Sequence, residues 1–299
     1  MTSEPSRCGT IAVVGLPNVG KSTLVNRLVG EKVAITGPRP HTTRHAVRGV
    51  LNHGSAQLVF QDTPGVARHH STPLHRIMQG SVQAALEDAD IVVAMFSATD
   101  LTVEDQRWVE RMQAGKGCIV AVLNKIDRIK PKTKLLPMLR QLSDWGDFTA
   151  VVPCSAESGA NLDNVVLELV KHLPAGPWLF PPGQVTDAGM TFRIGEIIRE
   201  KLMRRLHAEV PYGLLVEVEH LQQTKKGWRI HAVIWIEREQ HKPIVIGKGG
   251  DVLKAVGSSA RPELRRLLEG DVHLELWVKV RESWSADENA LKRFGFEVS

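Results

Sequence analysis

The chain has 299 residues, 42% hydrophobic and 24% charged, a composition typical of a globular protein long enough for two modest domains. Its net charge of +5 is divided almost evenly between the two halves, so neither half is a basic arm that would bind nucleic acid by charge alone. No apolar run reaches the ~18–20 residues that span a bilayer, and the N-terminus lacks the apolar core of a secretory signal, so we expect a cytoplasmic protein. The three cysteines, Cys8, Cys118 and Cys154, are widely spaced, which argues against a zinc knuckle or a disulfide framework.

The first half of the chain alternates short apolar runs with helical patterns. Continuous apolar strands that alternate with helices predict a mostly parallel sheet with helices on both faces, an α/β domain whose ligands bind at the carboxyl ends of the strands. Helices are predicted at residues 21–30 and 74–90 and from about residues 103 and 161. Strands are predicted at residues 10–16, 46–52, 56–62, 91–97, 118–124 and 149–155, with the second and third forming a hairpin.

A proline-rich stretch at residues 173–187 cannot continue a helix and predicts a semi-rigid linker. We therefore expect one domain at residues 1–175, a linker at 176–190 and a second domain at 191–299. The second domain has the predicted order α-β-β-(short α)-α-β, which indicates an α+β fold. Its predicted elements are a helix at 192–206, strands at 212–221 and 228–237, a helix at 251–268, a strand at 272–280 and a short final helix.

The stretch GLPNVGKST, between a predicted strand and a predicted helix, fits the pattern G-x-x-x-x-G-K-[ST]. The glycines let backbone N–H groups turn inward around a phosphate, and the N-terminal end of the helix adds a favourable dipole. Lys21 can reach the β- and γ-phosphate oxygens, and Ser22 can bind Mg²⁺. We therefore predict a phosphate site at Gly15, Leu16, Pro17, Asn18, Val19, Gly20, Lys21, Ser22 and Thr23.

Two further motifs predict that the base is guanine. In NKID, the carboxylate of Asp127 can accept hydrogen bonds from N1–H and the exocyclic amino group of guanine, a donor pair that adenine lacks. Asn124 can tie this loop to the phosphate loop, and the stem of Lys125 can lie over the ring. In CSAES, which follows the next strand, Ser155 and Ala156 extend the site, with the Ala156 N–H facing guanine O6.

Two polar segments are expected to respond to the γ-phosphate. In the first, residues 37–49, either Thr42 or Thr43 can close over Mg²⁺, and spacing alone does not choose between them. In the second, Asp62 can hold Mg²⁺ through water and the Gly65 N–H can meet the γ-phosphate. Loss of that phosphate would release both loops. The predicted switch residues are Thr42, Thr43, Asp62, Thr63, Pro64, Gly65 and Val66.

Val66 stands where many GTPases carry a glutamine that aligns the attacking water, and its side chain cannot do so. Phosphoryl transfer depends mainly on positioning and on charge neutralisation, so backbone groups and a bound cation can replace that glutamine. We predict that Asn18 helps to bind K⁺ and that intrinsic hydrolysis is slow.

An RNA site is predicted in the second domain, at the G-x-x-G loop formed by Gly247, Lys248, Gly249 and Gly250 directly before a helix. Such a loop between two helices lets the backbone approach a nucleic-acid backbone, with a helix N-terminus facing phosphate.

Three tryptophans, at positions 228, 235 and 277, alternate with apolar residues and are expected in the core. Basic residues also gather on two predicted helices: Arg193, Arg199, Lys201, Arg204 and Arg205 on the first, and Arg261, Arg265 and Arg266 on the second. Either group taken alone indicates a solvent-exposed helix face and not an RNA site.

Taken together, GLPNVGKSTLVNRLVG, HTTRH, DTPG, NKID, SAES, IIREKLMRRL, VIGKGG and VHLELWVKV resemble the Era family of bacterial ribosome-assembly GTPases over almost the whole chain. The resemblance implies an α/β P-loop GTPase domain followed by a smaller α+β domain of the type II KH fold. It implies binding of GTP or GDP with Mg²⁺, and binding of the 3′ region of small-subunit ribosomal RNA during maturation of that subunit. A cytoplasmic monomer with peripheral inner-membrane association is also implied.

The family pattern TTR makes Thr43 the expected Mg²⁺ ligand, and an apolar residue such as Val66 is in pattern. Some relatives place the loop lysine third in G-x-x-G, whereas here Lys248 is second, which leaves open the phosphate that it touches.

Two other functions fit the motifs. The first is a GTPase of the same branch that acts on a different RNA; the double-GTPase type would carry a second phosphate loop, which the sequence lacks. The second is a constitutive RNA-binding protein whose nucleotide site is only structural. The intact Lys21, Ser22 and Asp62 argue against it, and it predicts RNA affinity that does not depend on the nucleotide.

Overall fold

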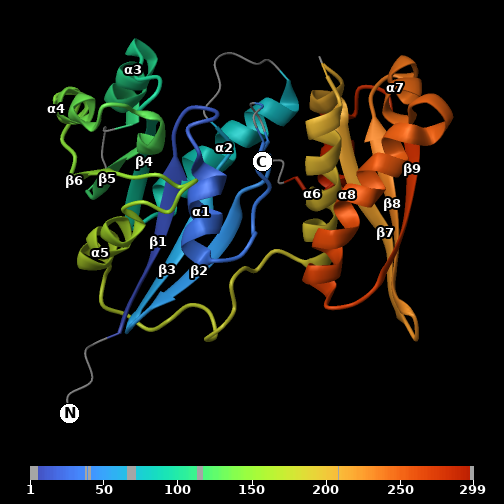
Figure 1. Ribbon diagram of the computed structural model, residues 1–299, viewed down its shortest axis with the longest axis horizontal. Helices are drawn as coiled ribbons and strands as arrows, with labels where there is room; N and C mark the ends of the chain where they lie inside the picture. Colours follow the sequence, from blue (N-terminus) through green and yellow to red (C-terminus); the bar gives the residue numbers. More distant parts are fainter. Residues whose placement is uncertain are drawn as a thin grey trace. The chain divides into compact units, whose positions relative to one another are not determined.

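The computed structural model describes residues 6–37, 39, 42–65, 72–112, 117–207 and 209–296. The described residues form two compact units, drawn in Figure 1 with the first unit in blue to yellow and the second mostly in orange and red. The first unit covers Met1–Ala34, Thr43–His69 and Met78–Asp187. The second covers Ala188–Ser299 together with Ile35–Thr42 and His70–Ile77.

The first unit is built on a six-stranded sheet with the order β2-β3-β1-β4-β5-β6. Strand β2 runs antiparallel to β3 as the predicted hairpin, and all other neighbours are parallel, which confirms the mostly parallel sheet. The strands are β1 (Arg7–Val14), β2 (Val47–His53), β3 (Ala56–Asp62), β4 (Ile91–Ser97), β5 (Ile119–Asn124) and β6 (Ala150–Pro153).

Helices cover both faces of this sheet, as the apolar strands predict. Alternate residues of β1, β4 and β5 pack with α2, α3 and α4 in one core, in which Phe96 makes edge contacts with Trp108 at 5.9 Å and with Trp145 at 6.1 Å. The opposite face is closed by the buried apolar residues of α1 and α5. The helices are α1 (Lys21–Val29), α2 (Pro73–Asp88), α3 (Val103–Met112), α4 (Leu135–Ser143) and α5 (Leu162–His172).

Helix α4 was not predicted from the sequence. Pro137 interrupts its apolar pattern, and proline inside a helix normally breaks it. In the structure Pro137 lies in the first turn of α4, where a backbone N–H has no partner within the helix, so its absence costs little.

The proline-rich stretch lies against the edge of the sheet in the first unit. The side chain of Gln57 on β3 is fully buried, and its amide accepts hydrogen bonds from the backbone N–H groups of Leu179 and Phe180, each at 2.9 Å, and donates to the Phe180 carbonyl at 2.9 Å. Further along, the Val50 N–H donates to the Val185 carbonyl at 2.9 Å. The chain therefore stays hydrogen-bonded to the first unit as far as Val185, well beyond the end of α5 at His172.

The second unit is a three-stranded sheet in the order β7-β8-β9, with β8 antiparallel to β7 and parallel to β9. Helices α6 and α8 pack on one face of this sheet around a core that includes Ile194, Ile198 and Leu202, the face predicted from the sequence. The element order α-β-β-α-α-β confirms the predicted α+β fold. The elements are α6 (Met190–Arg205), β7 (Leu214–Thr224), β8 (Gly227–Ile236), α7 (Lys242–Ile246), α8 (Asp251–Leu268), β9 (Val272–Val280) and α9 (Glu288–Arg293).

Two expectations for the second unit were wrong. Trp277 is 59% exposed, because Leu276 and Val278 face the helices and strand alternation places Trp277 on the opposite face of β9. Arg199 and Lys201 of α6 are buried and ion-paired, so they are not part of a solvated basic face. No helix in the described part of the chain is long and apolar enough to cross a membrane.

Candidate functional site

The predicted phosphate loop connects β1 to α1, at the carboxyl end of the sheet (Figure 1). Gly15, Asn18 and Gly20 have φ values of 150°, 65° and 108°, so the loop turns in a way that ordinary residues disfavour. A Cβ atom at Gly20 would lie 2.3 Å from Nδ2 of Asn124, and one at Gly15 would lie 2.5 Å from the Met95 carbonyl oxygen. Glycine is therefore required at both positions by close packing.

Lys21, the first residue of α1, is buried beneath this loop. Its Nζ donates to the carbonyl oxygens of Gly15 at 3.0 Å and Leu16 at 3.1 Å. Burial lowers the pKa of Lys21 to about 8, although the negative charge of Asp62 raises it. A phosphate in the loop would supply the anion that favours the charged ammonium.

Three oxygen-bearing side chains converge next to Lys21. Ser22 Oγ lies 2.9 Å from Thr43 Oγ1 and donates to Asp62 Oδ2 at 2.7 Å, and Thr43 Oγ1 donates to the same carboxylate oxygen at 3.1 Å. The second oxygen, Oδ1, is buried with no hydrogen-bond partner among the described residues. Burial raises the pKa of Asp62 to about 6, although hydrogen bonds from Ser22 and Thr43 and the charge of Lys21 lower it.

This cluster has the chemistry of a magnesium site that is completed by phosphates. Mg²⁺ prefers oxygen ligands and usually takes one or two carboxylates, with waters and nucleotide phosphates for the rest. No group of three or more His, Cys, Asp or Glu side chains suited to a metal occurs among the described residues. The structure brings Thr43 into the cluster, whereas the hydroxyl of Thr42 donates to the Arg39 carbonyl at 2.8 Å.

The segment after β3 runs beside the phosphate loop. The hydroxyl of Thr63 donates to the Val13 carbonyl at 2.8 Å, which ties the end of β3 to β1. A Cβ atom added to Gly65 would lie 3.0 Å from Cα of Pro17, so this position also favours glycine. Pro64 connects the two, and Val66 lies outside the described residues.

The predicted base-recognition residues form a second hydrogen-bonded group. Asn124 donates from Nδ2 to the Val19 carbonyl at 2.8 Å, and its Oδ1 accepts from the Ala156 N–H at 2.9 Å. The predicted tie from Asn124 to the phosphate loop is therefore present. The Ala156 N–H, expected to face guanine O6, donates to Asn124 in this structure, which links the loop after β6 to the same group.

Asp127 and Lys125 complete this group. Ser155 Oγ donates to Asp127 Oδ1 at 2.6 Å, and the Asp127 side chain remains 30% exposed. Lys125 has a left-handed backbone with φ 65° and donates from Nζ to the Asn18 carbonyl at 2.5 Å. Asp127 is thus oriented by Ser155 while part of its carboxylate stays accessible to a ligand.

The G-x-x-G loop of the second unit connects α7 to α8. Gly247, Gly249 and Gly250 have φ values of 78°, 60° and 79°, and Lys248 is exposed between them. A Cβ atom at Gly247 would lie 2.8 Å from the Val252 backbone nitrogen, whereas one at Gly249 would meet no atom within 4 Å. The loop therefore presents open backbone beside the N-terminus of α8.

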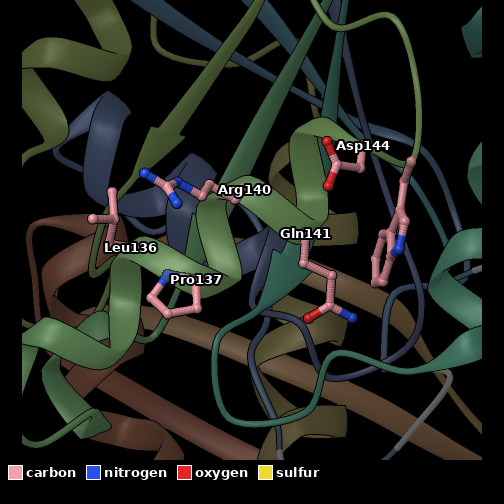
Figure 2. A pocket seen from close by; sticks show the side chains of 6 residues that line it. Leu136, Pro137, Arg140, Gln141 and Asp144 are labelled. Atoms are coloured by element: carbon pink, nitrogen blue, oxygen red, sulfur yellow. The ribbon is translucent and has the colours of Figure 1, made fainter.

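An open pocket on helix α4 belongs to neither of these sites. Figure 2 shows its lining, which mixes apolar and charged side chains and contains none of the predicted site residues. The lining residues are Leu136, Pro137, Arg140, Gln141, Asp144 and Trp145.

The two units define the class of this protein, a P-loop GTPase domain joined to a KH domain. The family model described as 50S ribosome-binding GTPase matches residues 10–125, and the KH domain model matches residues 209–285. GTPase Era of Pseudomonas putida is 42% identical over 294 residues, which cover 98% of this chain and 97% of that protein. GTPase Era of Pseudomonas entomophila is 42% identical over 297 residues, 99% of each chain.

Solved structures agree with these relatives over nearly the whole chain. Era in complex with MgGDPNP and nucleotides 1506–1542 of 16S ribosomal RNA superposes with a TM-score of 0.94 at 37% identity, covering 97% of this chain and 99% of that one. A variant of Aquifex aeolicus Era bound to GDP and AlF4⁻ gives 0.93 at 38% identity, with the same coverage. The chain belongs to the Era family of GTPases.

Proposed function

We propose that this protein is a GTP-dependent switch that hydrolyses GTP slowly, binds the 3′ region of small-subunit ribosomal RNA and assists assembly of the small ribosomal subunit. The observation that carries the proposal is that one chain holds both the Ser22–Thr43–Asp62 cluster beside the phosphate loop and a G-x-x-G loop, and that 97% of the chain matches an Era structure that holds MgGDPNP and 16S ribosomal RNA together. The domain division that accompanies it is residues 1–175, a linker at 176–190 and an RNA-binding domain at 191–299.

In the nucleotide site, the backbone of residues 15–23 cradles the phosphates and Lys21 contacts the β- and γ-phosphates. Ser22 and Thr43 would bind Mg²⁺, and Asp62, whose Oδ1 has no hydrogen-bond partner among the described residues, would hold the ion through water. When bound, Mg²⁺ neutralises the charge on the phosphate oxygens. Residues 62–66 and Thr42 respond to the γ-phosphate as the switch segments.

In the base site, Asp127 accepts the two guanine donors, and Asn124, Lys125, Ser155 and Ala156 hold the loops in place around it. The bond from Ser155 to Asp127 supports this role, because it fixes one carboxylate oxygen and thereby orients the other. Selectivity for guanine then rests on a single carboxylate.

In the second domain, Gly247, Lys248, Gly249 and Gly250 contact the RNA backbone. The open space around Gly249 supports this assignment, since a close-packed loop could not receive a nucleic acid.

The experiment that tests the switch compares RNA affinity in two nucleotide states. We expect a fragment of the 3′ end of 16S ribosomal RNA to bind at least about tenfold more tightly with a non-hydrolysable GTP analogue than with GDP, because coupling energies between linked sites usually reach that size. Fluorescence anisotropy at fixed salt measures both values, and an RNA of unrelated sequence is the control. Equal affinities with GTP analogue, GDP and no nucleotide would instead indicate constitutive RNA binding.

This chain has Val66 where many GTPases carry a glutamine that aligns the attacking water. We propose that a bound K⁺ ion compensates by adding positive charge beside the phosphates. Asn18 is the candidate ligand, and its exposed position in the phosphate loop supports this role. We expect hydrolysis to be roughly tenfold faster in KCl than in NaCl, with the difference lost in Asn18→Ala. Asn18→Gly is the matched variant, since glycine adopts the observed φ of 65° without strain. Equal rates in both salts for all three proteins would remove K⁺ from the mechanism.

The protein is further proposed to act as a cytoplasmic monomer with peripheral association at the inner membrane. Flotation of the purified chain with anionic lipid vesicles tests the membrane part, and sedimentation velocity tests the oligomeric state. If the protein does not float with the vesicles at any lipid concentration, the membrane association is rejected and only the cytoplasmic location remains proposed.

A further inference from the structure

Basic side chains gather around the start of helix α4 in the first unit. Residues 128–140 contain five basic residues and no acidic one, whereas the whole chain has a net charge of only +5. Lys130, Lys134 and Arg140 have no ion-pair partner in the described part of the chain, so an anion from solution can pair with them. All five side chains are exposed, and we call them the α4 basic cluster: Arg128, Lys130, Lys132, Lys134 and Arg140.

The α4 basic cluster is held on ordered backbone next to the base-recognition residues. Arg128 directly follows Asp127, and its Nε lies 4.0 Å from Asp127 Oδ2. A short 3-10 helix, Lys132–Lys134, then leads into α4. The ammonium group of Lys132 donates to the Ile126 carbonyl, which ties this short helix back to the loop after β5. The charges therefore lie on a fixed surface and not on a free tail.

The open pocket on α4 lies beside these charges and has a volume of about 510 Å³. Figure 2 shows the guanidinium of Arg140, the amide of Gln141 and the carboxylate of Asp144 around it. Residues four apart share one face of a helix, and the lining follows this rule in two rows: Leu136, Arg140 and Asp144, and Pro137, Gln141 and Trp145. Polar groups that form hydrogen bonds thus alternate with apolar and aromatic surface.

Such a surface suits single-stranded RNA. Unpaired bases stack on aromatic rings or on the planar guanidinium of arginine, and their polar edges form hydrogen bonds with side chains. The phosphates that connect them need cations nearby, which the α4 basic cluster supplies. The volume of the pocket is within the roughly 300–1,000 Å³ of sites that hold small organic ligands, so one base has room to enter.

A protein or a membrane fits the same surface less well. Lysine is depleted at the core of protein interfaces, yet three of the five basic residues here are lysines. A helix that lies on a bilayer needs a free apolar face. The apolar side of α4 is not free, because it packs into the core of the first unit through Leu135, Met138, Leu139 and Leu142.

We propose that the α4 basic cluster and the adjacent pocket form a second RNA-binding site, located in the GTPase domain. The phosphates of a single-stranded segment lie along the basic cluster, and one unstacked base enters the pocket against Trp145 and Arg140. The inference deepens the proposed function and rests on it, since it assumes that this protein acts on RNA. All residues of the site belong to the first unit, so the site is separate from the G-x-x-G loop.

Photocrosslinking reports the two RNA sites separately. The probe is an oligouridine of about 12 nucleotides that contains 4-thiouridine, and mass spectrometry of the full chain locates the adducts. In the wild type we expect adducts within residues 128–145 as well as around residues 247–250. In the variant Lys130→Ala/Lys134→Ala/Arg140→Ala, the first set should fall at least about tenfold while the second set persists.

The salt dependence of binding counts the phosphate contacts. In anisotropy titrations over a series of KCl concentrations, the plot of log K against log[KCl] should become shallower by about 2 in the triple variant. Each phosphate contact on a single strand contributes about 0.7 to this slope, and three are removed. GTP affinity should stay within about twofold of the wild type, because Lys132 and the base-recognition residues are unchanged.

Two further variants separate this site from general effects of charge. Arg107→Ala/Arg111→Ala/Lys171→Ala removes three exposed cations from α3 and α5 and should leave the adducts and the slope unchanged. Arg140→Lys keeps the charge but removes the planar group on which a base can stack. It should keep the slope and lower the yield of adducts at the pocket, and an unchanged yield would reject the base contact.

The outcomes also distinguish this inference from the proposed function. Wild-type adducts confined to residues 191–299, or a triple variant that behaves like its control, would reject the α4 site alone. Lost flotation with anionic vesicles and unchanged RNA adducts in the triple variant would assign the surface to a membrane and also reject it. A wild type that binds neither the oligouridine nor the 16S ribosomal RNA fragment overturns the proposed function itself.

Discussion

Asp127→Asn is expected to shift nucleotide preference from GTP towards XTP by at least about a hundredfold, the largest single change in specificity open to this site. The carboxylate accepts from two guanine donors, whereas an asparagine amide presents one donor and one acceptor, which suits xanthine with its additional carbonyl oxygen. The bond from Ser155 Oγ at 2.6 Å can persist to the amide oxygen, so the loop should keep its conformation. Competition between GTP and XTP for a fluorescent analogue measures the ratio.

Asp163→Asn is the matched control for this change. It removes an equal charge from an exposed position in the first turn of α5, away from the base site, and should leave the ratio unchanged. A variant Asp127→Asn that retains wild-type preference for GTP would mean that another group reads the base.

Gly249→Asp is expected to weaken binding of the 16S ribosomal RNA fragment by roughly tenfold or more while leaving GTP binding intact. A carboxylate in the loop would repel the phosphate backbone that the loop is proposed to approach. The change should be tolerated by the fold, because a Cβ atom there meets no atom within 4 Å and aspartate adopts the observed φ of 60° more readily than most residues. Anisotropy titrations of RNA and of nucleotide on the same samples test both parts.

Gly249→Asn separates charge from shape in this experiment. Asparagine has nearly the same size and the same tolerance for a left-handed backbone, so it should lose much less RNA affinity than aspartate. Equal losses in the two variants would attribute the effect to bulk, and loss of nucleotide binding as well would indicate misfolding. Unchanged RNA binding in Gly249→Asp would exclude the loop as a contact.

Local sequence signals were enough to predict most of the helices and strands and to locate most of the candidate site. The strands of the first unit are continuous apolar runs, and α1, α8 and β9 begin at the residues that their patterns and caps indicate. The phosphate loop and the residues around Asp127 could be placed because each lies within a few positions of a strand end. Parallel strands bring such ends to one edge of a sheet. Helix α4 was missed because a proline in its first turn imitates a helix break.

The sequence by itself determined the two domain types, and it predicts the residues of the nucleotide site and the loop proposed to meet RNA, because these depend on short motifs in a fixed local context. Only the tertiary structure shows that the hydroxyl of Thr43, and not that of Thr42, bonds to Asp62, because adjacent hydroxyls differ in the partner that each one reaches and not in their spacing. The tertiary structure also shows that Arg199 and Lys201, which were expected on a solvated face, are buried in a network of ion pairs. Burial of a charge depends on partners distant in the chain, Glu263 for one and the Thr42 carbonyl for the other, and no local pattern encodes such contacts.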